Sequence, residues 1–222
     1  MKSAWIWAGA LAISISAAGC KTSDTMVGAG GGSDASSSTG GNGLTCASYC
    51  NKIMAHCILQ TQQYTTEANC LASCPAFPAG AVGAQMGNSL ACRTYHSGVA
   101  AEDPGTHCVH AGPGGDGVCG DPCDGYCEIA QSVCSGQNRV YANPVECQAA
   151  CKARRTDIKY SVGTGFNSGN ELACLLYYVQ EAAAAPDDHC SDLAEATTPC
   201  RDGLGGAGGA GGAGGAGGAG GI

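Results

Sequence analysis

The chain has 222 residues, 17 of them cysteine, and a formal net charge of −8 at pH 7. The negative charge argues against nucleic acid as a partner, because nucleic-acid binding needs a basic surface. Large apolar side chains are scarce: the chain has two Phe, and both Trp (Trp5 and Trp7) lie near the N-terminus. A hydrophobic core alone would therefore be weak, and so many cysteines indicate a disulfide scaffold.

The N-terminal segment has the layout of an export signal, with a basic residue followed by an apolar run. At about 16 residues the run is short for a membrane span of roughly 20. It ends in "SAAGC", with small residues at Ala18 and Gly19 before Cys20. This ending resembles the lipobox of bacterial lipoproteins, which implies that residues 1–19 are a signal peptide and that Cys20 carries the lipid. Lys21 follows the cysteine, and by the same resemblance an outer-membrane anchor is expected.

Two segments are predicted to be disordered. Residues 20–45 are rich in Gly, Ser and Thr, and residues 203–222 form a low-complexity "GGA" array. Neither segment has enough apolar side chains to offset the entropy of ordering the chain. We interpret the first as a tether that spans about 25–30 Å and the second as a flexible tail.

An internal duplication organises the cysteines between the two segments. The first copy contains Cys46, Cys50, Cys57, Cys70, Cys74, Cys92, Cys108 and Cys119. The second copy contains Cys123, Cys127, Cys134, Cys147, Cys151, Cys174, Cys190 and Cys200. The intervening counts are 3, 6, 12, 3, 17, 15 and 10 in the first copy and 3, 6, 12, 3, 22, 15 and 9 in the second. Each copy has an even number, so all sixteen are predicted to form disulfides, which leaves Cys20 for the lipid.

The cysteine spacing predicts the first two helices of each copy. On a helix Cys46, Cys50 and Cys57 form one narrow stripe, and their counterparts in the second copy do the same. A second helix is predicted after Thr66, a good N-cap residue, and after the corresponding Asn143. Both second helices contain an i,i+4 cysteine pair, which also forms a single stripe.

A third helix is predicted to begin near Asn88 and near Asn170. In the second copy it is rich in Ala and Leu and should stop before Pro186. The predicted fold class is therefore all-α: two tandem disulfide-stapled helical modules of about three helices each, at residues 46–121 and 122–202. The recurrent Tyr49 and Tyr126 each precede a stripe cysteine, which favours packing in the core.

Antiparallel helices with i,i+4 cysteine pairs can be joined by two disulfide rungs. This geometry predicts the pairs Cys46–Cys74, Cys50–Cys70, Cys123–Cys151 and Cys127–Cys147. For the remaining cysteines of the first copy we expect Cys57–Cys92 and Cys108–Cys119. Eight cysteines allow 105 pairings, so other sets stay open.

The stretch "LACRTYHSGVAAEDPGTHCVHAGPGGDGVCG" (residues 90–120) resembles duplicated cysteine-rich lipoproteins predicted from myxobacterial genomes. The resemblance extends over about residues 46–200. It implies export and a helical, disulfide-rich domain, but it carries over no activity and no functional residues.

Several metal and redox motifs are absent. Haem attachment needs C-x-x-C-H and thioredoxin-like chemistry needs C-x-x-C, whereas the close pairs here are C-x3-C. A copper or zinc site built from His96, His107 and His110 is the alternative, if the segment that carries them folds back on itself. The second copy has Tyr178 in place of His96, and only His107 recurs, as His189. We therefore expect no cofactor and interpret these histidines as surface or packing residues in a loop.

No nucleotide or hydrolase fingerprint is present. Asp188–His189 could suggest a hydrolytic dyad, but the first copy has Thr106 at the equivalent position. The glycine-rich residues 111–125 are interpreted as a linker between the copies. We therefore predict that the protein is a non-enzymatic outer-membrane lipoprotein of a Gram-negative bacterium. Its expected role is that of a structural or binding module for an unknown envelope or extracellular ligand. A metal-handling lipoprotein and an extracellular hydrolase with an unrecognised site are the alternatives.

Overall fold

The computed structural model of the chain describes residues 44–156, 158–164, 169 and 171–201. These residues all belong to one unit of the chain, residues 37–222. The predicted signal peptide, Cys20, the tether up to residue 43 and the "GGA" tail lie outside the described residues. No helix among the described residues is long and apolar enough to cross a membrane.

The described part of the chain is helical, with eight α-helices and six short 3-10 helices. The α-helices are α1 (Cys46–His56), α2 (Glu67–Ser73), α3 (Leu90–Val99), α4 (Pro104–Ala111), α5 (Pro122–Val133), α6 (Pro144–Lys152), α7 (Leu172–Ala184) and α8 (Pro186–His189). The 3-10 helices are η1 (Leu59–Thr61), η2 (Cys74–Ala76), η3 (Gly115–Gly117), η4 (Gly136–Asn138), η5 (Val162–Thr164) and η6 (Cys190–Leu193). The all-α prediction is confirmed.

Local capping explains where the predicted helices begin. The Thr66 hydroxyl accepts a hydrogen bond from the Asn69 amide, and the Asn143 side chain accepts one from the Glu146 amide. Both residues therefore satisfy a backbone donor that the first helical turn leaves free. α3 begins just after the expected position, because Ser89 provides its cap.

Each repeat contains a fourth helix that the sequence analysis did not predict. α4 follows Asp103, whose carboxylate accepts a hydrogen bond from the Thr106 amide, and Pro104 occupies its first position. α8 also has a proline, Pro186, at its first position, but this proline follows Ala185, which makes no side-chain capping hydrogen bond. Proline is favoured at the first position of a helix, because it loses no intrahelical hydrogen bond there.

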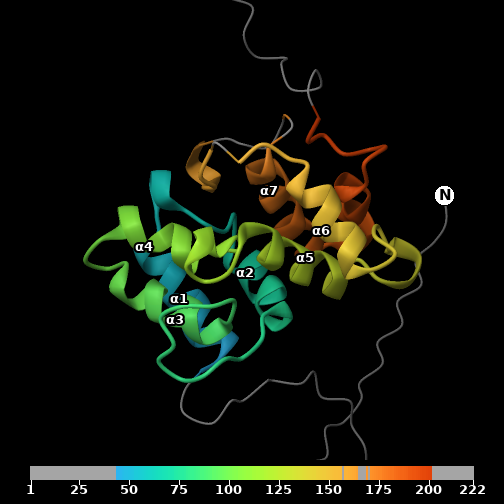
Figure 1. Cartoon of the computed structure of the whole chain (residues 1–222). Helices are drawn as coiled ribbons and strands as arrows, with labels where there is room; N and C mark the ends of the chain where they lie inside the picture. The colour runs from blue at the N-terminus through green and yellow to red at the C-terminus, as the bar shows by residue number, and fades with distance from the viewer. Residues whose placement is uncertain (1–43, 157, 165–168, 170, 202–222) are drawn as a thin grey trace, which may run out of the picture. The chain divides into compact units, whose positions relative to one another are not determined.

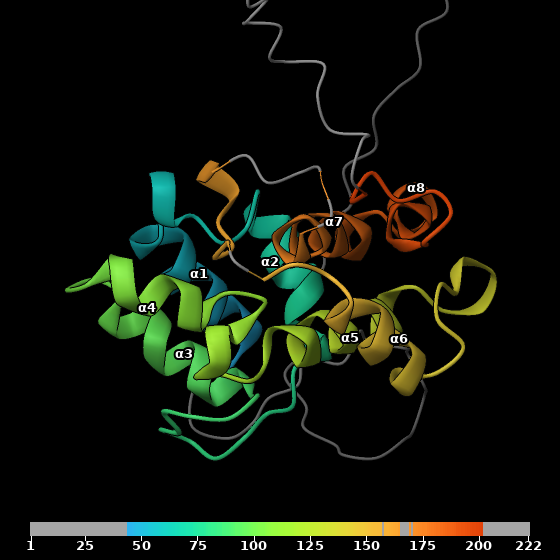
Figure 2. The ribbon, with the colours of Figure 1, turned by 45° about the horizontal axis from the view of Figure 1, so that its top comes forward.

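The helices of the two repeats pack in the same arrangement (Figure 1). In the first repeat α1 contacts both α2 and α3, and α3 contacts α4. In the second repeat α5 contacts both α6 and α7, and α7 contacts α8. In Figure 2, α1, α3 and α4 lie on the left and α5 and α6 on the right, with α2 near the centre and α7 above α5.

Eight disulfides join cysteines within the described residues, and each of them stays within one repeat. The four predicted rungs are confirmed: Cys46–Cys74, Cys50–Cys70, Cys123–Cys151 and Cys127–Cys147. They tie α1 to the end of α2, and α5 to α6. The helical stripes therefore face each other as the spacing indicated.

The other two predicted pairs, Cys57–Cys92 and Cys108–Cys119, are wrong. The first repeat instead forms Cys57–Cys108 and Cys92–Cys119, and the second repeat forms the matching Cys134–Cys190 and Cys174–Cys200.

The orientation of α3 explains the exchange of partners. His56 Nδ1 lies 2.8 Å from the Ser97 carbonyl, so the ends of α1 and α3 are side by side. Cys92 is in the first turn of α3, and the five residues to Ser97 rise about 7.5 Å. The chain then reverses into α4, which brings Cys108 back to the end of α1, where Cys57 lies.

The two repeats meet where α2 contacts α7, and further contacts join η1 to η5 and α5 to η2 and η3. Gln180 on α7 is fully buried, and its side-chain oxygen accepts a hydrogen bond from the Thr65 amide at 2.9 Å. The Thr65 hydroxyl donates to Glu181 Oε1 at 2.7 Å. Polar side chains of one repeat thus satisfy the backbone at the helix start of the other.

Candidate metal centre

Three histidines of the first repeat converge between α3 and α4. His96 lies in the second half of α3, and His107 and His110 lie three residues apart on α4. Residues three apart share one face of a helix, and here that face is turned to α3. The interpretation of His107 as a loop residue is therefore wrong, since α4 holds it.

The imidazoles are close enough for their nitrogens to approach a single point. Each can offer a ligand nitrogen such that the three lie within 4.8 Å of one another. His96 Nδ1 and His107 Nδ1 are 3.0 Å apart. The ring centre of His110 is 5.0 Å from that of His96 and 5.9 Å from that of His107.

A backbone contact orients the lone pair of His96. This side chain is buried, and its Nε2 lies 3.0 Å from the Gln85 carbonyl oxygen. A carbonyl can only accept, so Nε2 donates and the neutral ring has its lone pair on Nδ1. Metal-binding histidines commonly donate their second N–H to a backbone carbonyl in this way.

His110 has one nitrogen without a partner. Its Nδ1 is buried and makes no hydrogen bond, whereas its Nε2 lies 3.9 Å from Asp116 Oδ2. A buried polar atom without a partner is costly in a folded protein. A metal ion beside Nδ1 would satisfy this atom.

Burial also favours the neutral form of two of the rings. It is the largest cause that lowers the pKa of His96, with the Gln85 carbonyl opposing it and His107 adding to it. Burial likewise lowers the pKa of His110, followed by the neighbouring His96, whereas Asp116 opposes the shift. Neutral imidazole is the form that binds metal.

Disulfides and a tyrosine hold the two helices that carry the histidines. Cys57–Cys108 anchors α4 next to His107, and Cys92–Cys119 anchors α3 one turn before His96. The Tyr49 hydroxyl donates to the Ala111 carbonyl at 2.6 Å, at the end of α4. The geometry of the cluster is therefore set by covalent links and buried contacts.

A second group of potential ligands overlaps the first. The Cys92 and Cys119 sulfurs also lie within 4.8 Å of a His96 nitrogen. Both sulfurs belong to a disulfide, however, and metal binding by cysteine needs the thiolate. In the oxidised protein the three histidines are therefore the available ligand set.

The second repeat has different side chains at the same positions. Counted from the matched cysteines, Tyr178 replaces His96 and Asp192 replaces His110, while His189 corresponds to His107. His189 Nδ1 lies 2.8 Å from Asp192 Oδ2. The repeat without three histidines thus provides an internal reference for the repeat that has them.

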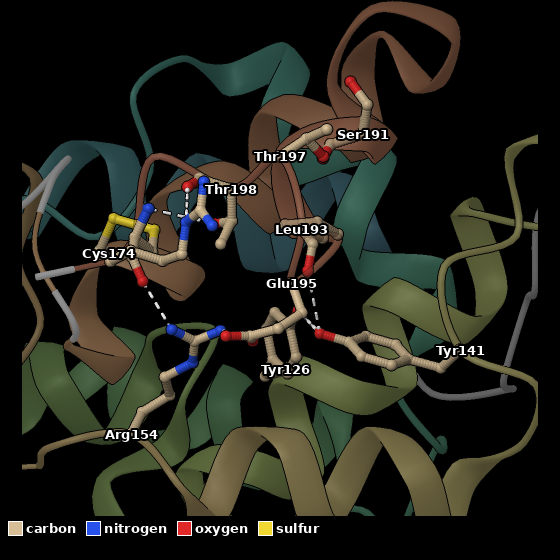
Figure 3. Close-up of polar contacts among 11 residues, drawn as sticks. Tyr126, Tyr141, Arg154, Cys174, Ser191, Leu193, Glu195, Thr197 and Thr198 are labelled. Atoms are coloured by element: carbon tan, nitrogen blue, oxygen red, sulfur yellow. Dashed lines mark hydrogen bonds and ion pairs between the residues drawn. A yellow bond between two sulfur atoms is a disulfide. The ribbon is translucent and has the colours of Figure 1, made fainter. Parts of the chain in front are cut away.

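The polar cluster of the second repeat in Figure 3 is a saturated structural network. The buried Arg154 donates to the Cys200 carbonyl at 2.6 Å and pairs with Glu195 Oε2 at 2.5 Å. The Tyr141 hydroxyl donates to the Leu193 carbonyl at 3.2 Å. These groups are occupied by one another and by the backbone, so we assign them to the fold.

The glycine-rich residues 111–125 are more than a linker. Residues from Pro122 onward form the first turn of α5, and Asp116 approaches both His110 and Lys159. Asp116 and Gln85 were not predicted from the sequence as neighbours of the histidines. For Asp116, the only indication in the sequence is an acidic residue between two glycines. For Gln85, the contact is made by a backbone carbonyl, which no sequence pattern indicates.

The region of the first repeat matches the model of a known protein family. Residues 19–122 match the model of the BfoA family C-terminal domain. The matched region contains the whole first repeat with its three histidines, and the second repeat lies almost entirely outside it. The description of this domain states no activity or ligand. No curated protein and no solved structure matches the chain.

Proposed function

We propose that the first repeat binds a divalent transition-metal ion through Nδ1 of His96, His107 and His110. The observation that carries this proposal is the convergence of three imidazoles, one of which has a buried nitrogen without a partner. The runner-up function considered from the sequence thereby becomes the leading one. We propose a binding role, which keeps to the non-enzymatic expectation from the sequence.

The chemistry of the ligand set favours zinc or copper. Imidazole suits Zn²⁺ and Cu²⁺, and the sixteen cysteines within the described residues are all held in disulfides. Two nitrogens that bind one tetrahedral ion at about 2.0–2.1 Å lie about 3.3 Å apart. The 3.0 Å between His96 Nδ1 and His107 Nδ1 is close to this separation. Because the Gln85 contact leaves the lone pair of His96 on Nδ1, His107 Nδ1 is the donor of this pair. When the ion binds, the proton on His107 Nδ1 has to leave that nitrogen.

The rest of the proposal concerns where the protein works. We propose an exported lipoprotein, anchored in the outer membrane through Cys20, that holds the metal site on a tether outside the bilayer. Eight disulfides support export, because disulfides persist in oxidising compartments. Because the chain is acidic, we expect no nucleic-acid partner. We also propose that the protein binds a partner in the cell envelope or outside the cell.

Native mass spectrometry of the full chain, purified from membranes in detergent without reductant, tests both statements at once. We expect a lipid adduct on Cys20 and, after addition of Zn²⁺ or Cu²⁺, one bound ion per chain. Reductant must be left out, because a freed Cys92 and Cys119 would create a second ligand set with His96.

Single substitutions identify the ligands. His96→Ala, His107→Ala and His110→Ala should each weaken metal binding by more than the roughly 10–100-fold typical of losing an outer-shell partner, because each removes one of three direct ligands. His56→Ala and His189→Ala are the matched controls and should bind like the wild type. Equal binding by all five variants, or no binding by the wild type, would refute the metal site. An unmodified Cys20 would refute only the lipid anchor.

A further inference from the structure

Asp116 occupies an unusual backbone conformation beside the histidines. Its φ angle is +46°, and its neighbours Gly115 and Gly117 also have positive φ angles. Few side chains tolerate this left-handed region, and Asp and Asn are among those that do. The turn thus defines the backbone position of Asp116, and its carboxylate lies near His110 of α4.

One oxygen of Asp116 faces two cations or potential donors. Oδ2 lies 2.6 Å from Lys159 Nζ of the second repeat and 3.9 Å from His110 Nε2 of the first. The lysine side chain is 71% exposed, whereas that of Asp116 is 25% exposed. The Asp116 carboxylate therefore has two neighbours: the partly buried His110 and the solvent-exposed Lys159.

The second nitrogen of a metal-binding histidine commonly donates to a carboxylate. This contact fixes the ring orientation and raises the basicity of the ligand nitrogen. If Nδ1 of His110 binds the ion, its Nε2–H points towards Asp116 Oδ2. The ion pair with Lys159 partly neutralises the same carboxylate and so weakens its attraction for the His110 N–H.

We propose that Asp116 positions His110 for metal binding and that Lys159 of the second repeat weakens this effect. This inference rests on the proposed metal site. The second repeat then sets the metal affinity of the first through one shared carboxylate oxygen. The ligand-bearing repeat and the repeat without ligands would have a functional connection as well as a structural one.

Four proteins test this proposal: the full-length wild type, Asp116→Asn, Lys159→Met and the double variant. Zinc affinity is measured without reductant by competition with a chromophoric chelator. Asn tolerates the same backbone conformation, so Asp116→Asn removes the charge without straining the turn. Arg139→Met, an exposed cation of the second repeat, controls for the change in net charge.

Asp116→Asn should weaken zinc binding about 10–100-fold, the usual effect of losing such a partner. Lys159→Met should strengthen it about two- to five-fold, as expected for an exposed ion pair, and the gain should shrink at high salt. The decisive comparison is the double variant. If Lys159 acts through Asp116, Lys159→Met has no effect once Asp116 is Asn.

Two results would overturn the proposal while leaving the metal site intact. Asp116→Asn could bind zinc as well as the wild type, which would remove Asp116 from the site. Lys159→Met could strengthen binding equally in both backgrounds, which would mean simple charge repulsion of the ion. A wild type that binds no metal would instead refute the proposed function.

Discussion

At the scale of single residues, each repeat contains a buried pair of tyrosines. The Tyr49 and Tyr64 hydroxyls are 3.0 Å apart, and those of Tyr126 and Tyr141 are 2.8 Å apart. Burial raises the pKa of Tyr64 to about 12, although its hydrogen bond with Tyr49 opposes the shift. Burial also raises the pKa of Tyr49 and Tyr126 well above the ordinary range.

These shifts predict a loss of stability in alkali. Above about pH 10 the unfolded chain releases tyrosine protons that the folded chain retains. The free energy of unfolding should therefore decrease as the pH rises from about 10 towards 12. Urea titrations between pH 8 and pH 11 would show this decrease, and Tyr64→Phe should reduce its slope. Tyrosines that all ionise near pH 10 with unchanged stability would contradict the prediction.

The burial and the contacts of Arg93 could not be predicted from the sequence. It is fully buried, stacks 3.8 Å over the Phe77 ring, and donates to the Gly112 and Pro113 carbonyls. The same position of the second repeat is Leu175, which is also buried. A buried arginine needs several acceptors. Asn88 and Ser89, one turn earlier, provide two of them, whereas the Gly112 and Pro113 carbonyls come from a loop 19 and 20 residues away. Sequence proximity could not reveal this second pair.

At the scale of elements, the disulfides at the helix ends have unequal roles. Cys57–Cys108 joins α1 to the helix that carries His107 and His110, whereas Cys134–Cys190 joins equivalent elements in the repeat without the histidine cluster. Their sequence separations are similar, 51 and 56 residues. The two bridges should therefore stabilise the protein similarly and differ in their effect on metal binding.

Replacing each pair with alanine separates stability from metal affinity. Either double substitution should lower the free energy of unfolding by about 4 kcal/mol, the loop-closure value for such separations. Only Cys57→Ala/Cys108→Ala should also weaken zinc binding, because it frees the end of α4. Denaturant melts and chelator competition on both variants provide the comparison. Equal metal affinity in both would mean that the helix hairpin holds the histidines without this bridge.

At the scale of the whole described unit, the contact between repeats depends on buried polar groups. Gln180 accepts from the Thr65 amide of the first repeat, and its side-chain amide donates to the Tyr160 hydroxyl and the Leu176 carbonyl. Each repeat has four disulfides of its own. Weakening the contact should therefore uncouple the repeats without unfolding either one.

Gln180→Met tests the coupling. The substitution keeps the length of the side chain but leaves the Thr65 amide without its partner, which should cost about 1–3 kcal/mol. In calorimetry the wild type should unfold in one transition and the variant in two overlapping ones. Gln137→Met, at an exposed position, is the control. If the variant unfolds in a single transition at the same temperature as the wild type, Gln180 does not couple the repeats, and the other contacts between them do.

Local chemistry explains how much could be predicted from the sequence. The stripe of Cys46, Cys50 and Cys57 and the cap at Thr66 depend only on helical periodicity and on neighbours within one turn. They therefore predicted α1, α2 and the two rungs between them. The candidate site was named only as an alternative, because nothing local indicates that His96 faces α4.

The sequence by itself determined the class of protein: a duplicated, helical, cysteine-paired scaffold whose histidines are enriched in the first copy. Only the tertiary structure decided that α4 reverses against α3, that Cys57 pairs with Cys108, and that Asp116 lies between His110 and Lys159. The physical reason is range. Periodicity and capping act within a few residues, whereas the meeting of the histidines depends on how whole helices pack.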